Sequence, residues 1–157
     1  VLNGVSKAYS MTGWRIGYAA GPQKLIGAMK KIQSQSTSNP TSIAQVAAQA
    51  ALEGDQQCVK DMVKVFKQRH DYMVKALNEI DGVECLAGDG TFYVFPDFSG
   101  MQARLGCETD TDLAEKLLEA GVALVPGSAF GTPGHMRISF ATSDENLQKA
   151  VERLKAA

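Results

Sequence analysis

The chain of 157 residues has about the length of one domain. Its composition, with 45% hydrophobic and 21% charged residues, is typical of globular proteins rather than disordered ones. Sixteen lysines and arginines against seventeen aspartates and glutamates exclude a basic surface for nucleic acid, and no apolar run predicts a membrane segment. Three cysteines without a CxxC motif favour free thiols in a reducing, cytoplasmic compartment, and two histidines argue against a metal site.

The first third of the chain predicts one strand and two helices. Residues 14–20 alternate large apolar residues with other types, which is the period of a strand. Pro22 suits the first position of a helix, and apolar residues at helical spacing continue that helix up to the polar stretch 34–40. A second helix is expected to end at Gly54 and to face inward through four residues, Ile43, Val46, Ala47 and Ala50.

The rest of the chain predicts a charged helix and then strands and helices in α+β order. The long helix has an apolar face from Val59 to Ile80, with lysines opposite and His70 partly exposed beside the apolar face. Strands are expected over 83–86, 91–95, 122–125 and 136–141, and a helix over 109–120 with Leu113, Leu117 and Leu118 inward. A last helix is expected to begin with a capping box formed by Thr142 and Glu145.

Residues 6–18 form the segment whose side chains are best suited to take part in a chemical reaction. Lys7 stands alone among small and apolar residues, and burial there would favour a neutral amine that can form a Schiff base with a carbonyl. Arg15 follows as a permanent cation, with glycines on both sides that allow close backbone approach. A reactive amine and a fixed cation suit an aldehyde cofactor that carries a phosphate, although such a pair in a loop is more often structural.

Residues 4–17 resemble the lysine signature of the class I aminotransferases, which are pyridoxal-phosphate enzymes of fold type I. Further segments in the family's order extend the resemblance over all 157 residues, with the prokaryotic aspartate aminotransferases as the best-matching subgroup: 38–42, 90–93, 125–127 and 137–141. The resemblance implies the C-terminal portion of the family's fold. Because the chain opens on Val1, we also expect a piece of a longer protein.

The resemblance and the change in composition near Gly54 together predict two domains in an α/β chain. Residues 1–54 are expected to be the tail of the large cofactor-binding domain, including the Schiff-base lysine segment. Residues 55–157 are expected to be an α+β small domain, with a largely antiparallel sheet flanked by helices.

Three site residues follow from the resemblance. Lys7 is implied to bind pyridoxal 5'-phosphate as a Schiff base and to shuttle a proton between substrate and cofactor. Arg15 is implied to pair with the cofactor phosphate, and Arg137 to clamp the substrate α-carboxylate with its planar fork. The strand period places Arg137 on one face with Ser139 and Ala141, which fits an arginine aimed at a cleft.

The implied activity is amino-group transfer between an amino acid, aspartate or a related one, and a 2-oxo acid such as 2-oxoglutarate. The family resemblance also implies a homodimer, with no nucleic acid, membrane or metal partner. Two positions depart from the family's pattern. Gly4 replaces a hydroxyl residue that many relatives use to contact the phosphate, with Ser6 as a substitute, and Ser34 replaces an arginine of one dicarboxylate-specific subgroup.

Two other interpretations stay open at this point. One is a related pyridoxal-phosphate lyase or synthase. The other is a non-catalytic aminotransferase-like domain of a transcriptional regulator. For the 157-residue piece alone we expect no transamination, because the remaining active-site residues of the family lie upstream.

Overall fold

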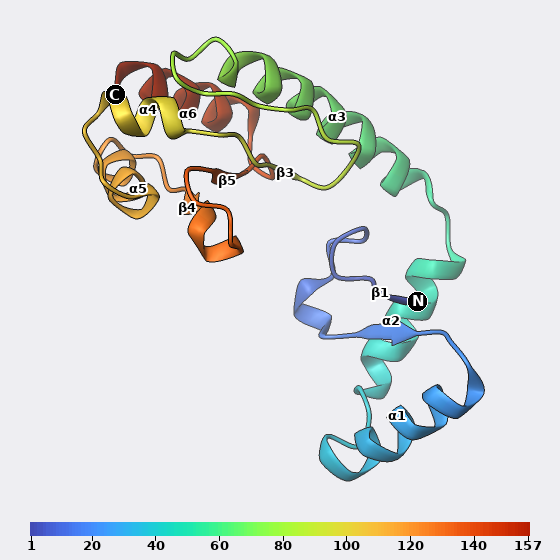
Figure 1. Ribbon diagram of the computed structural model, residues 1–157. Helices are drawn as coiled ribbons and strands as arrows, with labels where there is room; N and C mark the ends of the chain where they lie inside the picture. The colour runs from blue at the N-terminus through green and yellow to red at the C-terminus, as the bar shows by residue number, and fades with distance from the viewer. The chain divides into compact units, whose positions relative to one another are not determined.

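The computed structural model describes residues 1–157, which separate into two compact units, Val1–Met62 and Val63–Ala157 (Figure 1). The division falls inside helix α3 (Gln57–Leu77), and the domain boundary expected at Gly54 stays a prediction. Six α-helices and two small antiparallel sheets make an α/β chain, which confirms the expected fold class. None of the helices combines the length and the apolar character that a membrane span requires.

The first unit opens with a two-stranded ribbon. Strand β1 (Leu2–Gly4) pairs antiparallel with β2 (Gly17–Ala19), so that Gly4 lies opposite Gly17. The 3₁₀ helix η1 (Thr12–Trp14) occupies the beginning of the segment where a strand was expected, so that prediction is confirmed only for its second half. Arg15, in the left-handed region, separates the two elements and thereby breaks the strand.

Two helices complete the first unit, and their packing differs from the expectation. Helix α1 (Gln23–Ser36) continues into the polar stretch, and α2 (Ser42–Glu53) ends at Gly54 as predicted. The inward face of α2 was predicted wrongly, because Ala44 and Ala48 are buried whereas Ile43 and Val46 are 72% and 67% exposed. Periodicity finds an apolar stripe but does not identify what covers it. Within this unit the buried side chains of α2 are those of the two small residues Ala44 and Ala48.

The second unit contains a three-stranded sheet in the order β3–β5–β4. Strand β5 (Met136–Ser139) lies in the centre, and β3 (Tyr93–Val94) and β4 (Val125–Pro126) pair with it antiparallel on either side. These strands are shorter than predicted, and the segment 83–86 contributes only a single bridge between Glu84 and Asp97. Because the strands are short, few backbone hydrogen bonds join them, and burial of one face stabilises the sheet more than these bonds do.

Four elements accompany this sheet in the second unit (Figure 1). Besides the C-terminal part of α3 they are α4 (Ser99–Arg104), α5 (Asp110–Glu119) and α6 (Asp144–Ala156), with the 3₁₀ helix η2 (Gly127–Phe130) after β4. The helix expected over 109–120 and the expected last helix are both present. The short α4 was not anticipated, because six residues carry too little periodicity to stand out.

The core of the second unit is formed by the apolar faces of its helices and of β5. The side chains that are almost completely buried include Met73, Leu77, Phe98, Met101, Leu113, Leu117, Met136, Phe140 and Leu154. Leu113 and Leu117 face inward as predicted, whereas the prediction for Leu118 is wrong, since this side chain is 59% exposed. One residue further along a helix turns the side chain by about 100°, which carries Leu118 out of the core.

The N-terminal cap of the last helix differs from the prediction. The last helix takes Ser143 as its N-cap, not Thr142, and the Ser143 hydroxyl accepts the Asn146 N–H at 3.3 Å. A complete capping box forms instead at α5, where Thr109 and Asp112 bond reciprocally. Thr142 fits the capping-box pattern with Glu145, but the adjacent hydroxyl residue Ser143 has the extended backbone at the helix start and becomes the cap.

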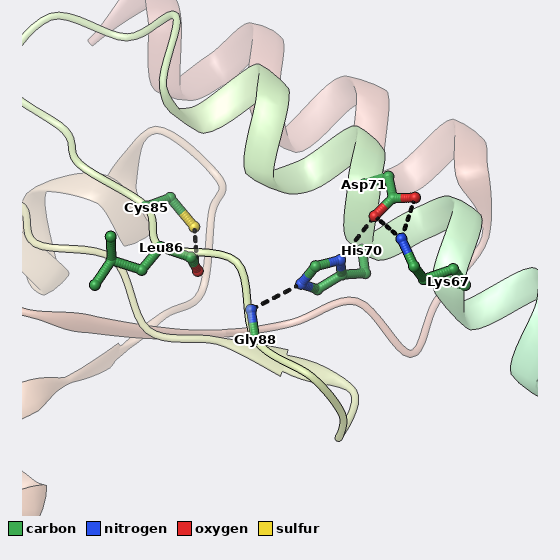
Figure 2. Close-up of polar contacts among 6 residues, drawn as sticks. All are labelled: Lys67, His70, Asp71, Cys85, Leu86 and Gly88. Carbon is green, nitrogen blue, oxygen red and sulfur yellow. Dashed lines mark hydrogen bonds and ion pairs between the residues drawn. The ribbon is translucent and has the colours of Figure 1, made fainter.

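His70 was expected to be partly exposed, and the structure corrects this, since only 7% of the residue is exposed. Figure 2 shows its ring between Asp71 and the backbone of Gly88. Its Nε2 accepts the N–H of Gly88 at 3.1 Å, so the proton belongs on Nδ1, which lies 3.0 Å from the carboxylate of Asp71. Hydrogen bonds from Lys67 and His70 lower the pKa of Asp71. His70 thereby ties α3 to the loop that leads into β3.

The three cysteines are free thiols, as expected from their odd number and the lack of a CxxC motif, but the burial expected for them holds only for Cys85. Cys85 is buried next to the same loop, with its Sγ 3.8 Å from the Leu86 carbonyl oxygen (Figure 2). Burial raises the pKa of the Cys85 thiol, which keeps it protonated and unreactive.

The core can be tested with two neighbouring leucines. We expect Leu117→Ala to lower the free energy of unfolding by about 2–5 kcal/mol, because Leu117 is fully buried. Leu118→Ala is the matched control on the same helix, and we expect a change within about 0.5 kcal/mol. Urea titration followed by circular dichroism measures both, and equal losses would contradict the assignment of the helix face.

Candidate functional site

Lys7 lies in the turn that follows β1. The turn is anchored by Val5, which is 1% exposed, and closed by N–H bonds from Ser10 to the Lys7 carbonyl and from Met11 to the Ser6 carbonyl, both 3.1 Å. Tyr9 in the same turn donates its hydroxyl to Gln56 at 2.8 Å. The Lys7 side chain is exposed, so the burial considered from the sequence is not provided by this chain.

Arg15 lies at the other end of the same loop, directly after η1. Its backbone is left-handed with φ 50°, and its Nη1 donates to the Thr12 carbonyl at 2.9 Å. A non-glycine residue in this region is strained, and the bond to Thr12 helps to hold it. A guanidinium carries five N–H donors, so groups beyond this bond are available to an anion.

The β1–β2 ribbon joins the two ends of the loop that carries Lys7 and Arg15. The strands approach closely at Gly17, where an added Cβ would lie 3.1 Å from the carbonyl oxygen of Asn3. This contact is tighter than an ordinary van der Waals contact, so the ribbon favours glycine at this position. The ribbon therefore fixes where the loop begins and ends.

Arg137 lies in the centre of the second unit, on β5. Its neighbours Met136 and Ile138 are buried, while Arg137 is half-buried and Ser139 exposed, so the alternation predicted for this strand is confirmed. The guanidinium carbon lies 4.7 Å from the ring centroid of Tyr93 and 4.7 Å from that of Phe130. No carboxylate of the chain pairs with this guanidinium.

A series of ring contacts leads from Phe130, next to Arg137, through Phe95 to His135. Phe130 contacts Phe95 edge to face with centroids 6.0 Å apart, and the Phe95 ring lies 5.1 Å from the His135 ring. The Nδ1 atom of His135 is buried without a hydrogen-bond partner. Sequence reasoning did not single out Tyr93 or Phe130. Pairing the strand 91–95 with 136–141 would have placed Tyr93 near Arg137, but no local signal marks Phe130.

The three residues predicted from the resemblance thus occupy two described regions. The structure brings Lys7 and Arg15 together in one loop of the first unit. Arg137 belongs to the second unit, where aromatic residues surround it.

Comparison with known proteins identifies the chain's relatives. The sequence model of the family described as Aminotransferase class I and II matches residues 1–154. The chain belongs to this family. Relatives include an aspartate/prephenate aminotransferase of Nitrosomonas europaea, 55% identical over 98% of this chain and 41% of the relative. An aspartate aminotransferase of Rhizobium meliloti is 51% identical over 99% of this chain and 40% of the relative.

Solved structures agree with this assignment to the class I and II aminotransferases. The crystal structure of the aspartate aminotransferase from Rhizobium meliloti matches with a TM-score of 0.93 at 50% identity, over 100% of this chain and 41% of that one. The Thermus thermophilus aspartate aminotransferase with maleate matches with a TM-score of 0.87 at 42% identity, over 99% and 40%. The chain therefore spans about two fifths of its relatives' length, and its place at their C-terminal end stays a prediction.

In this aminotransferase chain the backbone at the beginning of η2 is tightly packed. A Cβ on Gly127 would lie 2.2 Å from the Thr132 carbonyl oxygen, and the Gly127 N–H donates to the His135 carbonyl at 2.7 Å. The buried carboxylate of Asp110 accepts the Ser128 N–H at 2.7 Å. These contacts fix the turn η2, and with it the ring of Phe130.

Asp97 follows β3 in the chain and pairs with His135, the residue before β5. Its backbone bridges Glu84 and His135, and its Oδ1 accepts bonds from the Ser99 N–H at 2.7 Å and from the Ser99 hydroxyl. These bonds favour the ionised carboxylate and lower the pKa of Asp97 below the ordinary value of 3.8.

This shift makes a pH-dependent contribution to stability. A depressed pKa stabilises the fold above the unfolded value, and the contribution is lost as the pH falls through the folded value. We therefore expect Asp97→Asn to be less stable than the wild type at pH 7, with a difference that shrinks below about pH 4. Urea titrations between pH 7 and pH 2.5 measure this.

Ser99→Ala is the matched control for Asp97. It removes the hydroxyl donor but keeps the backbone N–H bond, so we expect a smaller pH-dependent difference than for Asp97→Asn. A difference between Asp97→Asn and the wild type that is the same at both ends of the pH range would contradict the prediction.

Proposed function

We propose that the protein carrying this chain is an aminotransferase that moves an amino group between an amino acid and a 2-oxo acid. The observation that carries the proposal is Arg137, a half-buried guanidinium held by two aromatic rings and without a carboxylate partner in the chain. Such a group is suited to bind a carboxylate of a substrate in a bidentate pair. The names of relatives at 46–55% identity support the same activity.

The residues present fit pyridoxal 5'-phosphate as the cofactor. Lys7 offers a primary amine for its aldehyde, and Arg15 offers guanidinium donors for its phosphate from the same loop. Both side chains are exposed in this chain and so can be reached by a ligand. When bound, the cofactor supplies the electron sink for bond changes at the substrate α-carbon.

Each of the three residues then has a separate task. The Nζ of Lys7 holds the cofactor and afterwards carries a proton to and from the substrate α-carbon. Arg15 anchors the phosphate as an ion pair, and Arg137 orients the substrate through its α-carboxylate. Because the orienting group and the proton carrier are different residues, substrate binding and proton transfer can be altered independently.

Aspartate or a related amino acid is the proposed donor, with 2-oxoglutarate as an acceptor, because the relatives are named for aspartate. Ser34 lies exposed on α1, where its hydroxyl donates to the Lys31 carbonyl at 2.8 Å. A serine offers no cation for an acidic side chain, so selectivity for aspartate needs another group. We also propose a homodimer, supported by exposed apolar side chains such as Ile32 and Ile43, and a cytoplasmic location, supported by free thiols.

Borohydride reduction tests the assignment of Lys7. In the full-length protein loaded with pyridoxal phosphate, reduction is expected to fix the cofactor on Lys7, because its amine is the proposed attachment point. Peptide mass spectrometry locates the label. Lys24→Arg, at an exposed lysine of α1, is the control that should leave labelling intact, while Lys7→Arg should abolish it. Labelling of a different lysine in the wild type would refute the assignment.

Replacement of Arg137 by lysine tests substrate recognition. The charge remains but the planar fork is lost, so we expect kcat/KM to fall by the equivalent of about 2 kcal/mol for amino-acid and oxo-acid substrates alike. Cofactor affinity should hardly change, because Arg15 is the proposed phosphate ligand. Arg104→Lys, at an exposed arginine of α4, is the matched control. Loss of cofactor with normal substrate affinity would require the two arginine roles to be exchanged.

A further inference from the structure

The guanidinium of Arg137 is held between elements on both sides of its strand. Tyr93 belongs to β3 and Phe130 to the turn η2 that follows β4, and the sheet order β3–β5–β4 places these strands on opposite sides of β5. Both rings lie with their centroids 4.7 Å from the guanidinium carbon. Rings from two flanking elements restrain the side chain more than either ring alone.

The sheet register explains why Tyr93 reaches Arg137. Tyr93 lies directly opposite Ser139, and Ser139 shares a face of β5 with Arg137. Tyr93 and Arg137 are therefore diagonal neighbours on one face of an antiparallel pair, within reach of long side chains. The next pair, Val94 and Ile138, is buried on the other face, so a slip of register would cost core packing.

Phe130 reaches the guanidinium because the beginning of η2 is fixed. Gly127 is packed against the carbonyl oxygens of Thr132 and His135, and Ser128 is bonded to Asp110. Phe130 is 47% exposed, and its ring also makes an edge-to-face contact with Phe95. A large apolar ring that stays near the surface and over a cation contributes little to the core, which points to a role at the guanidinium.

We propose that Tyr93 and Phe130 are positioning residues for substrate recognition: they hold the plane of the Arg137 guanidinium so that its N–H edge meets a carboxylate. The inference rests on the proposed role of Arg137. A bidentate pair requires the carboxylate to lie in the plane of the guanidinium. Stacking on the ring faces leaves this plane open and restrains its rotation.

Binding of maleate to the cofactor-loaded full-length protein tests the inference, since maleate is a dicarboxylate without an amino group to transfer. We expect Tyr93→Leu and Phe130→Leu to weaken maleate binding about fivefold each in calorimetry. Tyr93→Phe keeps the ring and should bind like the wild type. Leu118→Ala, at an exposed side chain of α5, is the control and should bind maleate like the wild type. Thermal unfolding of each variant verifies that it is folded.

Combination with Arg137→Lys separates positioning from a direct contact with the ligand. If the rings act through Arg137, we expect Tyr93→Leu to have little further effect on maleate binding in the Arg137→Lys background. Independent, multiplying effects would overturn the proposal, as would equal losses for Tyr93→Phe and Tyr93→Leu. If Arg137→Lys alone leaves maleate binding unchanged, the proposed role of Arg137 fails. If it weakens binding but neither ring variant does, only the positioning role fails.

Discussion

The central position of β5 is the constraint on which the second unit depends. A strand with partners on both edges has a fixed register, and its alternating side chains are thereby assigned to two faces. Met136 and Ile138 enter the core beneath the helices, and Arg137 must then emerge on the opposite face. The same pairing that buries the core therefore presents the one arginine proposed to bind substrate.

The elements around β5 continue this arrangement. Helices α3, α5 and α6 supply many of the buried apolar side chains, and a buried polar side chain on each of α3 and α5 bonds to a neighbouring loop or turn. His70 binds the loop before β3, and Asp110 binds the turn after β4. The loop before β3 and the turn after β4 each donate a backbone N–H to a helix side chain, and Tyr93 and Phe130, which follow these anchored residues, stack on the guanidinium.

The first unit is organised differently. A two-stranded ribbon and a turn hold the loop of Lys7 and Arg15, while large apolar side chains of α1 and α2 remain exposed, including Leu25, Ile32, Ile43 and Val46. Two-stranded ribbons are marginal on their own. The chain corresponds to about two fifths of its relatives' length, so a larger protein offers further surface against which such side chains can pack.

Local sequence patterns determined much of this structure. The periodicity of apolar residues located five of the six helices, Gly54 marked the end of one of them, and strand alternation placed Arg137 opposite the core face. The family signature pointed to Lys7 and Arg15 because it depends on residue type and spacing alone. These features are local, and local interactions favour them wherever the segment packs.

Only the tertiary structure decided which apolar and polar residues are buried. Leu118, Ile43 and Val46 are exposed although their pattern predicted burial, and His70 is buried because a distant loop at Gly88 supplies its partner. The rings of Tyr93 and Phe130 meet Arg137 only through strand pairing and a turn fixed by Asp110. Such contacts join residues far apart in the chain. Burial and register depend on which surfaces meet, and periodicity within one segment carries no information about its partner.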